Sequence, residues 1–379
     1  MAAILPPAML GIIGGGQLGR MFTIAAKTMG YRVTVLEPDP HSPAAAFADV
    51  HLCAPYGDAT ALQTLAGTCA AVTTEFENVD ADAMRMLAKT TRVSPSGDCV
   101  AIAQDRIAEK AWIAKAGLPT APYLALESAA ALAAVSDDAL AAYLPGILKT
   151  ARLGYDGKGQ QRVKTPAEAR AAFADLGVAC VLEKMLDLKL EVSAIVTRTS
   201  ASQMAVFPLA ENRHEGGILD VSIVPARIAA GLAASAQTMA QRLADELDYV
   251  GVLAVEFFVL GDDTLVVNEI APRPHNSGHY TLTACVTDQF QQQVRALCGL
   301  LPGSTELMTP VVMVNLLGDV WGEDGRAPKW DVLAEAPNAQ LYLYGKQEAR
   351  KGRKMGHFNV MAATADAALE QAEALKDTL

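Results

Sequence analysis

The sequence lacks the features that would place it in several common protein classes. Its six cysteines lie singly, without a C-x-x-C pair or the close spacing of a small disulfide framework, so we expect buried, reduced thiols. No apolar run is long enough to span a bilayer, and the first ten residues carry no basic segment of the secretory type. These absences predict a cytoplasmic protein with no membrane partner.

An excess of positive charge is also missing. The chain has 31 Lys and Arg against 42 Asp and Glu, a net charge of −11, and a pI near 5.1. Because nucleic acids and anionic membranes attract basic surfaces, we expect neither as a partner. Any anionic substrate must be held by a local group of cations. At 379 residues the chain exceeds what one hydrophobic core usually organises, so we expect two or three domains around a cleft.

The first hundred residues alternate apolar runs with amphipathic ones. Met9–Ile13, Arg32–Leu36 and Ala71–Thr74 are predicted strands, and a helix is predicted from Gln17, which is the pattern of a parallel α/β sheet. The prolines within 117–122 indicate a hinge into new structure. We divide the chain into an N-terminal domain (1–103), a linker helix with a small lid (104–186), a larger lobe (187–305) and a β-rich C-terminal region (306–379).

A first glycine loop, Gly14-Gly-Gly-Gln-Leu-Gly19, follows the first predicted strand, and Glu37 ends the next strand. This arrangement matches the dinucleotide fingerprint, so an NAD-dependent oxidoreductase is one hypothesis. The N–H groups at a helix start bind any phosphate, however, and a mononucleotide would suit equally. A glycine turn needed only for packing is the third alternative.

A second glycine loop lies between two predicted strands of the lid. It runs Lys149-Thr-Ala-Arg-Leu-Gly-Tyr-Asp-Gly-Lys-Gly-Gln160 and combines three glycines with cationic side chains. Such a loop can bring its backbone close to an anion while Lys149, Arg152 and Lys158 donate to phosphate oxygens. It is not a Walker A loop, because Gly159 stands where a metal-binding Ser or Thr is needed. A mobile hairpin tip is the plain alternative.

A predicted β-hairpin carries two acidic residues. Its apolar arms, Val252-Leu260 and Leu265-Ile270, flank a turn at Asp262 and Asp263. If Leu260 pairs with Leu265, Glu256 lies opposite Glu269. Opposed carboxylates in an apolar strand repel each other, and a divalent cation such as the Mg²⁺ of Mg-ATP would compensate. Asn268 would face the other side of a regular strand.

Two further polar segments follow the hairpin. In the proline-restrained loop after Glu269, Arg273 offers a fork for a carbonate-like anion, and His275 can donate a hydrogen bond or move a proton. A zinc site at His275 and His279 lacks a third ligand and is discounted. Near the C-terminus the only concentrated basic run is a possible monophosphate site, although a solvated loop would look the same: Lys346, Arg350, Lys351, Arg353 and Lys354.

Taken together, these segments resemble the ATP-grasp superfamily over essentially the whole chain. Within it the sequence is similar to the 5-(carboxyamino)imidazole ribonucleotide synthases. The resemblance is carried by five segments: Gly14-Gly-Gly-Gln-Leu-Gly-Arg20, Thr74-Glu-Phe-Glu-Asn78, Gly154-Tyr-Asp-Gly-Lys-Gly-Gln160, Ala210-Glu-Asn-Arg-His214 with Gly217-Ile-Leu-Asp220, and Asn268-Glu-Ile-Ala-Pro-Arg-Pro-His-Asn-Ser-Gly-His279.

This resemblance implies a fold and a nucleotide site. The fold is of mixed α/β and α+β class: a Rossmann-like N-terminal domain, a two-lobed ATP-grasp fold and a small β-rich C-terminal region. Glu256 and Glu269 would hold Mg²⁺, as two ions. The implied ATP contacts are Arg106, Lys149, Gly154, Tyr155, Asp156, Gly157, Lys158, Gly159, Gln160, Glu183, Lys184, Met185, Leu186, Glu191, His214, Asn268 and Glu269.

It also implies a reaction. Bicarbonate would attack the γ-phosphate of ATP, and the resulting carboxyphosphate would carboxylate the amine of 5-aminoimidazole ribonucleotide in purine (IMP) biosynthesis. Lys149, Arg273 and Mg²⁺ would stabilise charge, with His275 nearby and Asp156 at the amine. The substrate contacts implied are Gln17, Leu18, Lys346, Arg353 and Lys354 at the phosphate, and Glu75 and Asn276 near the ribose.

Several alternatives stay open at this point. A formate-dependent glycinamide ribonucleotide transformylase shares the architecture and the basic phosphate site, although Gln17-Leu18 and the second glycine loop favour the carboxylating enzymes. An oxidoreductase leaves the paired carboxylates unexplained, and a nonenzymatic regulator would be expected to have lost them. Lys184-Met185-Leu186 departs from the usual acidic and aromatic adenine-binding stretch. Arg213 and Glu215 flank His214 where other residues are expected. The family implies a homodimer.

Overall fold

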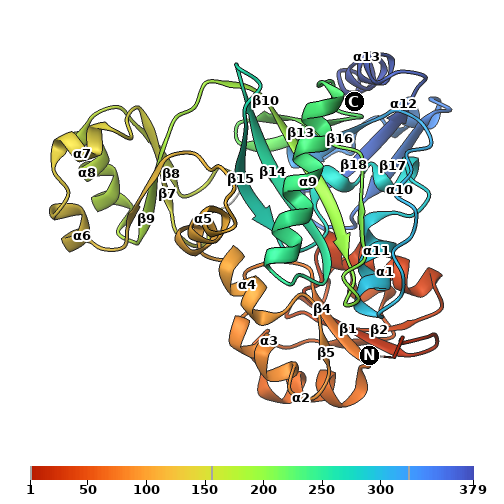
Figure 1. Cartoon of the computed structure of the whole chain (residues 1–379). Coiled ribbons are helices and arrows are strands. Elements are labelled where there is room, and N and C mark those ends of the chain that lie inside the picture. The colour runs from red at the N-terminus through yellow and green to blue at the C-terminus, as the bar shows by residue number, and fades with distance from the viewer. Residues whose placement is uncertain (1, 155–156, 323–324) are drawn as a thin grey trace.

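Three β-sheets organise the part of the chain that this computed structural model describes, residues 2–154, 157–322 and 325–379. A small sheet with its own helices projects to one side, and the N-terminal sheet lies below the large sheet in this view (Figure 1). The chain is a mixed α/β protein with parallel and antiparallel sheets. None of the helices in the described residues is long and apolar enough to cross a membrane.

The N-terminal sheet is parallel and has five strands in the order β3-β2-β1-β4-β5. This order is that of doubly wound nucleotide-binding sheets, in which ligands bind beyond the carboxyl ends of the strands. The predicted parallel α/β fold of this region is therefore confirmed. Its elements are β1 (Met9–Ile13), α1 (Gln17–Thr28), β2 (Arg32–Leu36), η1 (Ala45–Phe47), β3 (Val50–Leu52), α2 (Ala59–Thr68), β4 (Ala71–Thr74), α3 (Ala81–Leu87), β5 (Arg92–Val93) and α4 (Gly97–Ala103).

The projecting part is a four-stranded antiparallel sheet in the order β6-β9-β7-β8, covered by short helices. It has a separate core that includes Leu148, Phe173 and Leu182. Helix α8 begins with Pro166, after the capping side chain of Thr165. It ends at Leu176, and the next residue, Gly177, has a left-handed backbone conformation. The elements are α5 (Arg106–Lys115), β6 (Tyr123–Leu126), α6 (Ala129–Ala133), α7 (Asp137–Ala141), β7 (Gly146–Thr150), β8 (Gln160–Val163), α8 (Pro166–Leu176) and β9 (Cys180–Lys184).

The largest sheet has nine strands among the described residues, in the order β15-β14-β10-β12-β13-β16-β18-β17, with β11 paired to β10. The C-terminal strands β16, β17 and β18 thus continue the sheet that carries β14 and β15. Its strands are β10 (Leu188–Arg198), β11 (Met204–Val206), β12 (Ala210–Glu215), β13 (Ile218–Val224), β14 (Gly251–Leu260), β15 (Leu265–Ala271), β16 (Val311–Leu317), β17 (Ala339–Leu343) and β18 (Lys354–Met361).

Helices join this sheet to the rest of the molecule. One of them, α11, packs its buried Phe290, Val294 and Leu297 into the core of the N-terminal sheet, beside Leu10 and Phe22. Burying each such side chain contributes about 1.5–3 kcal/mol, so the two parts share a substantial apolar contact. The helices here are α9 (Ala230–Glu246), η2 (Asn276–Gly278), α10 (Thr281–Ala284), α11 (Gln289–Leu297), η3 (Gly318–Val320), α12 (Trp330–Ala334) and α13 (Ala365–Lys376).

All six cysteines are free thiols, as expected. Five are buried, whereas Cys53 is exposed, so the expectation of burial is wrong for that residue. Burial raises the pKa of the Cys180 and Cys298 thiols to about 11, which keeps them in the unreactive thiol form.

Candidate active site

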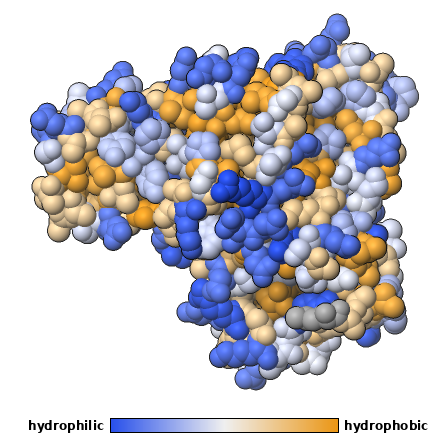
Figure 2. All heavy atoms as spheres, viewed as in Figure 1, coloured by the Kyte–Doolittle hydropathy of each residue, from blue (hydrophilic) through white to orange (hydrophobic). Residues whose placement is uncertain are grey.

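A polar cleft of about 610 Å³ lies where the lid, the nine-stranded sheet and the N-terminal sheet meet. Hydrophilic side chains gather at the centre of this face of the molecule (Figure 2). The carboxyl ends of β1 and β4 open into the cleft from one side, and β10, β14 and β15 form its floor. This position agrees with the rule that doubly wound sheets bind ligands beyond the carboxyl ends of their strands.

The cleft brings together most of the residues predicted from the sequence. Six predicted residues do not line it: Gly159, Glu183, Lys184, Met185, Leu186 and Arg353. Tyr155 and Asp156 lie outside the described residues. Those that line the cleft are Gln17, Leu18, Glu75, Arg106, Lys149, Gly154, Gly157, Lys158, Gln160, Glu191, His214, Glu256, Asn268, Glu269, Arg273, His275, Asn276, Lys346 and Lys354.

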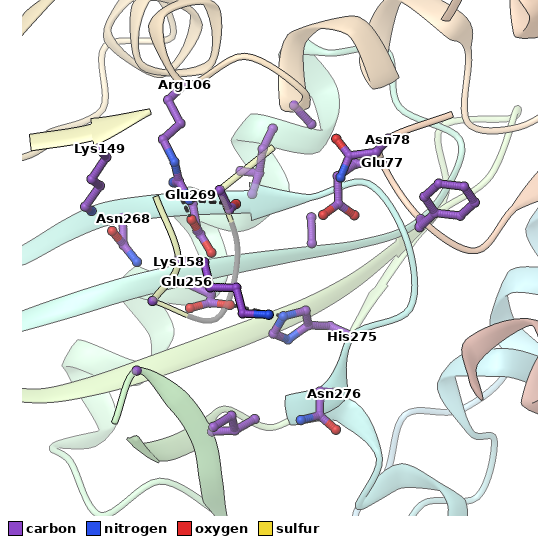
Figure 3. A pocket seen from close by; sticks show the side chains of 18 of the residues that line it. Glu77, Asn78, Arg106, Lys149, Lys158, Glu256, Asn268, Glu269, His275 and Asn276 are labelled. Atoms are coloured by element: carbon purple, nitrogen blue, oxygen red, sulfur yellow. Dashed lines mark hydrogen bonds and ion pairs between the residues drawn. The ribbon is translucent and has the colours of Figure 1, made fainter. Parts of the chain in front are cut away.

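The hairpin of β14 and β15 places Glu256 directly opposite Glu269, as predicted, but by a different register at the turn. Leu265 pairs with Val259 rather than with Leu260. One extra residue is then taken up by a β-bulge, because Phe257 pairs with Val267 and the next pair is Glu256 with Glu269. The bulge falls at Asn268 and supplies the local distortion that allows its side chain to share the cleft with both carboxylates (Figure 3).

Each carboxylate of the pair is held by a cation or an imidazole. Arg106 Nη1 lies 2.6 Å from Glu269 Oε2, and His275 Nε2 lies 3.1 Å from Glu256 Oε1. Burial would raise the pKa of Glu269, but Arg106 outweighs this effect and holds the pKa below its usual range. The buried Oδ1 of Asn268 has no hydrogen-bond partner among the described residues. Two carboxylates and an unpaired amide oxygen are the hard oxygen donors that Mg²⁺ prefers, so these residues fit that ion.

A buried group of charges supports the lid side of the cleft. The Glu183 carboxylate lies 3.0 Å from Lys149 Nζ and 3.3 Å from Lys110 Nζ. Lys110 is 1% exposed and was not predicted as a site residue. Burial lowers the pKa of Lys110, and the positive charge of Lys149 lowers it further, against the opposing effect of Glu183. Glu183 therefore fixes Lys149 from behind, without itself facing the cleft.

Helix α5 supplies a third carboxylate that sequence reasoning missed. Glu109 lines the cleft, and its Oε1 accepts a 2.6 Å hydrogen bond from the backbone N–H of Ile270 on the edge strand β15. Burial, and then the charge of Glu269, raise the pKa of Glu109. The signal was present in the helical spacing, since Arg106, Glu109 and Lys110 lie on one face of α5. Glu109 thus covers the open edge of β15 directly beside the carboxylate pair.

Arg273 is bound to the N-terminal domain. Its Nε lies 2.6 Å from Glu77 Oε2, and Glu77 was not predicted individually, although it lies in the segment Thr74-Asn78. Burial would raise the pKa of Glu77, but Arg273 outweighs it and keeps the pKa low. Gln104 donates to the backbone oxygen of Glu77 at 2.5 Å. The other unpredicted polar residues of the cleft are Asn78, Gln104 and Arg162.

The first glycine loop is largely occupied by the chain's own carboxylates. Gly15 N–H donates to Glu37 Oε2 at 2.8 Å, and the amides of Gly16 and Gly19 donate to the two oxygens of Glu75. Glu37 also accepts from Tyr56, so it does not project into open space as a ribose ligand would. Burial raises the pKa of Glu75, against the effect of these amides. This arrangement argues against a dinucleotide at the loop.

Two basic residues of the C-terminal run reach the same corner. Lys346 Nζ donates to Gln17 Oε1 and, at 2.6 Å, to the backbone oxygen of Lys354. Lys346 and Lys354 line the cleft, whereas Arg353 donates to the backbone oxygen of Glu348 at 2.9 Å.

Across the cleft, His214 Nδ1 lies 3.0 Å from Glu191 Oε2. Their ligand atoms and those of Glu256 all lie within 4.8 Å of one another.

Comparison with known proteins identifies the family of this chain. A model of the ribonucleotide synthetase preATP-grasp domain matches residues 8–104, the ATP-grasp domain matches 111–290, and the phosphoribosylaminoimidazole carboxylase C-terminal domain matches 311–371. The chain is 46% identical over 365 residues to the N5-carboxyaminoimidazole ribonucleotide synthase of Bacillus subtilis, which covers 96% of this chain and 94% of that protein. The Brucella melitensis enzyme is also 46% identical, covering 94% and 96%. The chain belongs to the N5-carboxyaminoimidazole ribonucleotide synthase family.

Solved structures of N5-carboxyaminoimidazole ribonucleotide synthases agree. The Staphylococcus aureus enzyme complexed with ADP superposes with a TM-score of 0.90 at 36% identity and covers 99% of both chains. The Aspergillus clavatus enzyme in complex with ADP and 5-aminoimidazole ribonucleotide gives 0.88 at 32% identity and covers 98% of both. The chain is therefore an ATP-grasp ligase that forms N5-carboxyaminoimidazole ribonucleotide by ATP-dependent carboxylation in purine biosynthesis, and the oxidoreductase hypothesis is wrong.

Proposed function

We propose that the cleft uses Mg-ATP and bicarbonate to carboxylate 5-aminoimidazole ribonucleotide through carboxyphosphate, releasing ADP and phosphate. The observation that carries this assignment is the position of the Glu256 and Glu269 pair. The pair lies in one continuous cleft, with Lys149 and Lys158 of the lid at one end and Gln17 and Lys346 at the other. Two phosphate-bearing molecules can therefore meet beside a metal site.

The lid side of the cleft is the proposed ATP end. Lys149 and Lys158 line it, and Gly157 and Gly159 take positive φ values of 76° and 70° that favour glycine. Both features suit close approach of the loop to phosphate oxygens. Glu183 and Lys184 end β9, and Met185 and Leu186 follow it; these four residues remain proposed contacts of the adenine nucleotide. Glu191 and His214, which pair with each other, are proposed to contact the ribose.

Glu256, Glu269 and Asn268 are proposed to hold Mg²⁺, as two ions. Bound there, the metal would neutralise the charge of the ATP phosphates during transfer. Arg106 supports this site by fixing one oxygen of Glu269, which leaves the other oxygen of that carboxylate without a hydrogen bond to any described residue. The acidic residues thus enter the reaction already oriented.

Arg273 is proposed to bind bicarbonate, with His275 beside it. Arg273 is buried against Glu77, which raises its pKa against the effect of burial and keeps the guanidinium charged beside the centre of the cleft. Its remaining N–H groups can orient a planar carbonate-like anion toward the γ-phosphate. Burial of these groups also excludes water, which would otherwise hydrolyse carboxyphosphate.

The opposite corner is the proposed site of the ribonucleotide substrate. Gln17 and Leu18 belong to the first turn of α1, where N–H groups have no partner within the helix and attract a phosphate. Lys346 and Lys354 supply positive charge, with Arg353 at their edge, and Glu75 and Asn276 lie close to where a ribose would follow. Asp156, proposed at the amine, is outside the described residues.

The wider predictions remain proposals. We propose a cytoplasmic homodimer with the domain division 1–103, 104–186, 187–305 and 306–379, which is supported by the separate sheet of the lid and by the ranges of the matching family models. Neither nucleic acid nor a membrane is expected as a partner.

The test is release of ADP with Mg-ATP, with 5-aminoimidazole ribonucleotide, bicarbonate or formate omitted in turn. We expect release that depends on the ribonucleotide and on bicarbonate, and that incorporates labelled bicarbonate into product. Turnover only with formate and glycinamide ribonucleotide would keep the metal site and overturn the proposed substrates.

A further inference from the structure

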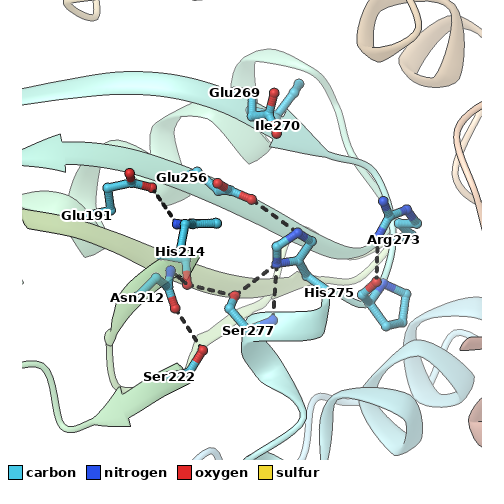
Figure 4. A network of polar contacts seen from close by, with 12 residues as sticks. Glu191, Asn212, His214, Ser222, Glu256, Glu269, Ile270, Arg273, His275 and Ser277 are labelled. Carbon is cyan, nitrogen blue, oxygen red and sulfur yellow. Dashed lines mark hydrogen bonds and ion pairs between the residues drawn. The ribbon is translucent and has the colours of Figure 1, made fainter. Parts of the chain in front are cut away.

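A chain of buried polar side chains crosses the floor of the cleft and ends at His275 (Figure 4). Ser222 Oγ donates to Asn212 Oδ1 at 2.8 Å, and Asn212 Nδ2 donates to Ser193 Oγ at 3.0 Å. Ser193 Oγ donates in turn to Ser277 Oγ at 2.7 Å, which lies 2.9 Å from His275 Nδ1. The three serines are 0% exposed and Asn212 is 6% exposed, so solvent does not compete for these contacts.

The register of the large sheet places Ser222, Asn212 and Ser193 on one face, and Ser277 approaches that face from η2. Asn212 on β12 is directly opposite Ser222 on β13, and Ser193 on β10 is directly opposite Glu256 on β14. Asn212 is opposite Glu191, two residues from Ser193 on β10, so its amide reaches Ser193 diagonally on the same face of the sheet. The hydrogen bonds thus lead to the residue opposite Glu256. Such a line of polar groups in an otherwise apolar sheet is costly to bury unless its hydrogen bonds are complete.

The direction of these hydrogen bonds follows from which atoms can donate. A backbone N–H can donate but never accept, and the Ser277 amide points at His275 Nδ1 at 3.3 Å. Nδ1 is therefore an acceptor and carries no hydrogen. Ser277 Oγ has a single hydrogen, receives one hydrogen bond from Ser193, and is left to donate its own to the same nitrogen. Two donors thus converge on Nδ1.

We propose that Ser277, Ser193, Asn212 and Ser222 are positioning residues that fix His275 in its Nε2–H tautomer. The ring hydrogen then lies on the nitrogen 3.1 Å from Glu256 Oε1. His275 consequently acts as a hydrogen-bond donor that orients Glu256. The orientation of the Glu256 carboxylate is thereby set by hydrogen bonds that begin at Ser222 on β13.

The first test reads the tautomer directly in the full-length protein. Two-bond ¹H–¹⁵N spectra of ¹⁵N-histidine-labelled protein separate protonated from bare ring nitrogens, and loss of one signal set in His275→Gln assigns this ring among the 6 histidines. We expect Nε2 to be protonated and Nδ1 to be bare. A protonated Nδ1 in the wild-type protein overturns the proposal.

The second test removes single hydroxyl groups and measures carboxylation. Ser277→Ala deletes one of the two donors to Nδ1, and Ser193→Ala breaks the chain one step earlier. We expect a mixture of tautomers in Ser277→Ala and a fall in kcat of about three- to tenfold, the effect of one ordinary hydrogen bond. The KM for ATP should stay unchanged. Ser193→Ala should show a smaller fall in kcat and a smaller shift in the tautomer mixture.

Thr197→Val is the matched control, because Thr197 lies on the same strand, is 0% exposed, and its hydroxyl has no hydrogen-bond partner among the described residues. It should change neither the spectrum nor kcat. If both serine variants match Thr197→Val in spectrum and kcat, the chain does not position His275. The kinetic arm rests on the proposed function, but the spectrum requires no turnover. A wrong substrate would therefore leave the tautomer result standing, whereas full carboxylation with a protonated Nδ1 would overturn this inference alone.

Discussion

Replacing Glu183 by glutamine removes the only negative charge that contacts both the buried Lys110 and the partly buried Lys149 in the described part of the lid. Burial would raise the pKa of Glu183, but Lys149 and then Lys110 outweigh this effect, so the carboxylate is ionised at neutral pH. The distances are 3.0 Å to Lys149 Nζ and 3.3 Å to Lys110 Nζ. In Glu183→Gln the two ammonium groups lose this compensation and repel each other.

The magnitude follows from what each lysine can do next. Breaking a buried ion pair by removing one partner costs about 3–5 kcal/mol. Lys149 is 12% exposed and can turn toward the cleft, whereas Lys110 is 1% exposed and can only lose its proton. We therefore expect the lower end, a loss of about 3 kcal/mol in the free energy of unfolding of the lid. Adding Lys110→Met should restore about 1 kcal/mol, because it removes one of the uncompensated charges.

The assay is hydrogen exchange of the backbone amides of β7 and β9, which reports opening of the lid itself, together with urea unfolding of the whole chain. Glu127→Gln is the control, because Glu127 is an exposed glutamate of the same lid. If Glu183→Gln exchanges within about 0.5 kcal/mol of this control, the triad does not stabilise the lid. The reasoning also fails if Lys110→Met destabilises the glutamine variant further.

Three other changes test separate parts of the site and core. Glu269→Gln should lower kcat by at least about 100-fold at saturating Mg-ATP, as measured by ADP release, because it removes a preorganised charge; activity within threefold of wild type would exclude a metal role. Lys346→Met should raise the KM for 5-aminoimidazole ribonucleotide about tenfold and leave the KM for ATP unchanged, whereas the exposed Lys329→Met should alter neither. Burial lowers the pKa of His357 from 6.5 to about 3, so only the unfolded chain takes up this proton between those values. His357 should therefore contribute a loss of about 2 kcal/mol from pH 7 to pH 5, and His357→Gln should reduce the acid sensitivity by that amount; equal acid sensitivity of variant and wild type in urea unfolding would contradict it.

The local periodicity of the sequence was sufficient to predict these strands, but it did not predict the contacts between distant parts of the chain. The predicted strands Met9–Ile13, Arg32–Leu36 and Ala71–Thr74 coincide with β1, β2 and β4, because short apolar runs and glycine turns determine them locally. The pairing of the two hairpin carboxylates was also predicted correctly, although the observed register differs from the predicted one in two ways that cancel. The connection is one residue longer at the turn than expected, and the bulge at Asn268 restores the pairing of Glu256 with Glu269.

The supporting residues could not be found in this way. Glu77 and Arg273 are 196 residues apart, and Lys110 meets Glu183 only because α5 packs behind the lid sheet. Neither pairing leaves a trace in hydrophobic period or turn chemistry, since both depend on how separate sheets pack. The hydrogen-bonded series from Ser222 to Ser277 was missed for a related reason. Its members are single small polar residues on three strands and in η2, and only the strand register and the packing of η2 bring them together.

The carboxylates at the first glycine loop have a consequence for ligand selection. A diphosphate linker needs donors for two phosphoryl groups, but Gly15, Gly16 and Gly19 have already given their N–H groups to Glu37 and Glu75. These tethered acids cannot diffuse away, so a second phosphoryl group from solution competes with a permanent occupant. The loop therefore keeps the glycine spacing of a dinucleotide-binding loop, but its remaining amides suit the single phosphate proposed for this site. A fingerprint that counts glycines detects the shape of such a loop and not which of its amides are still available.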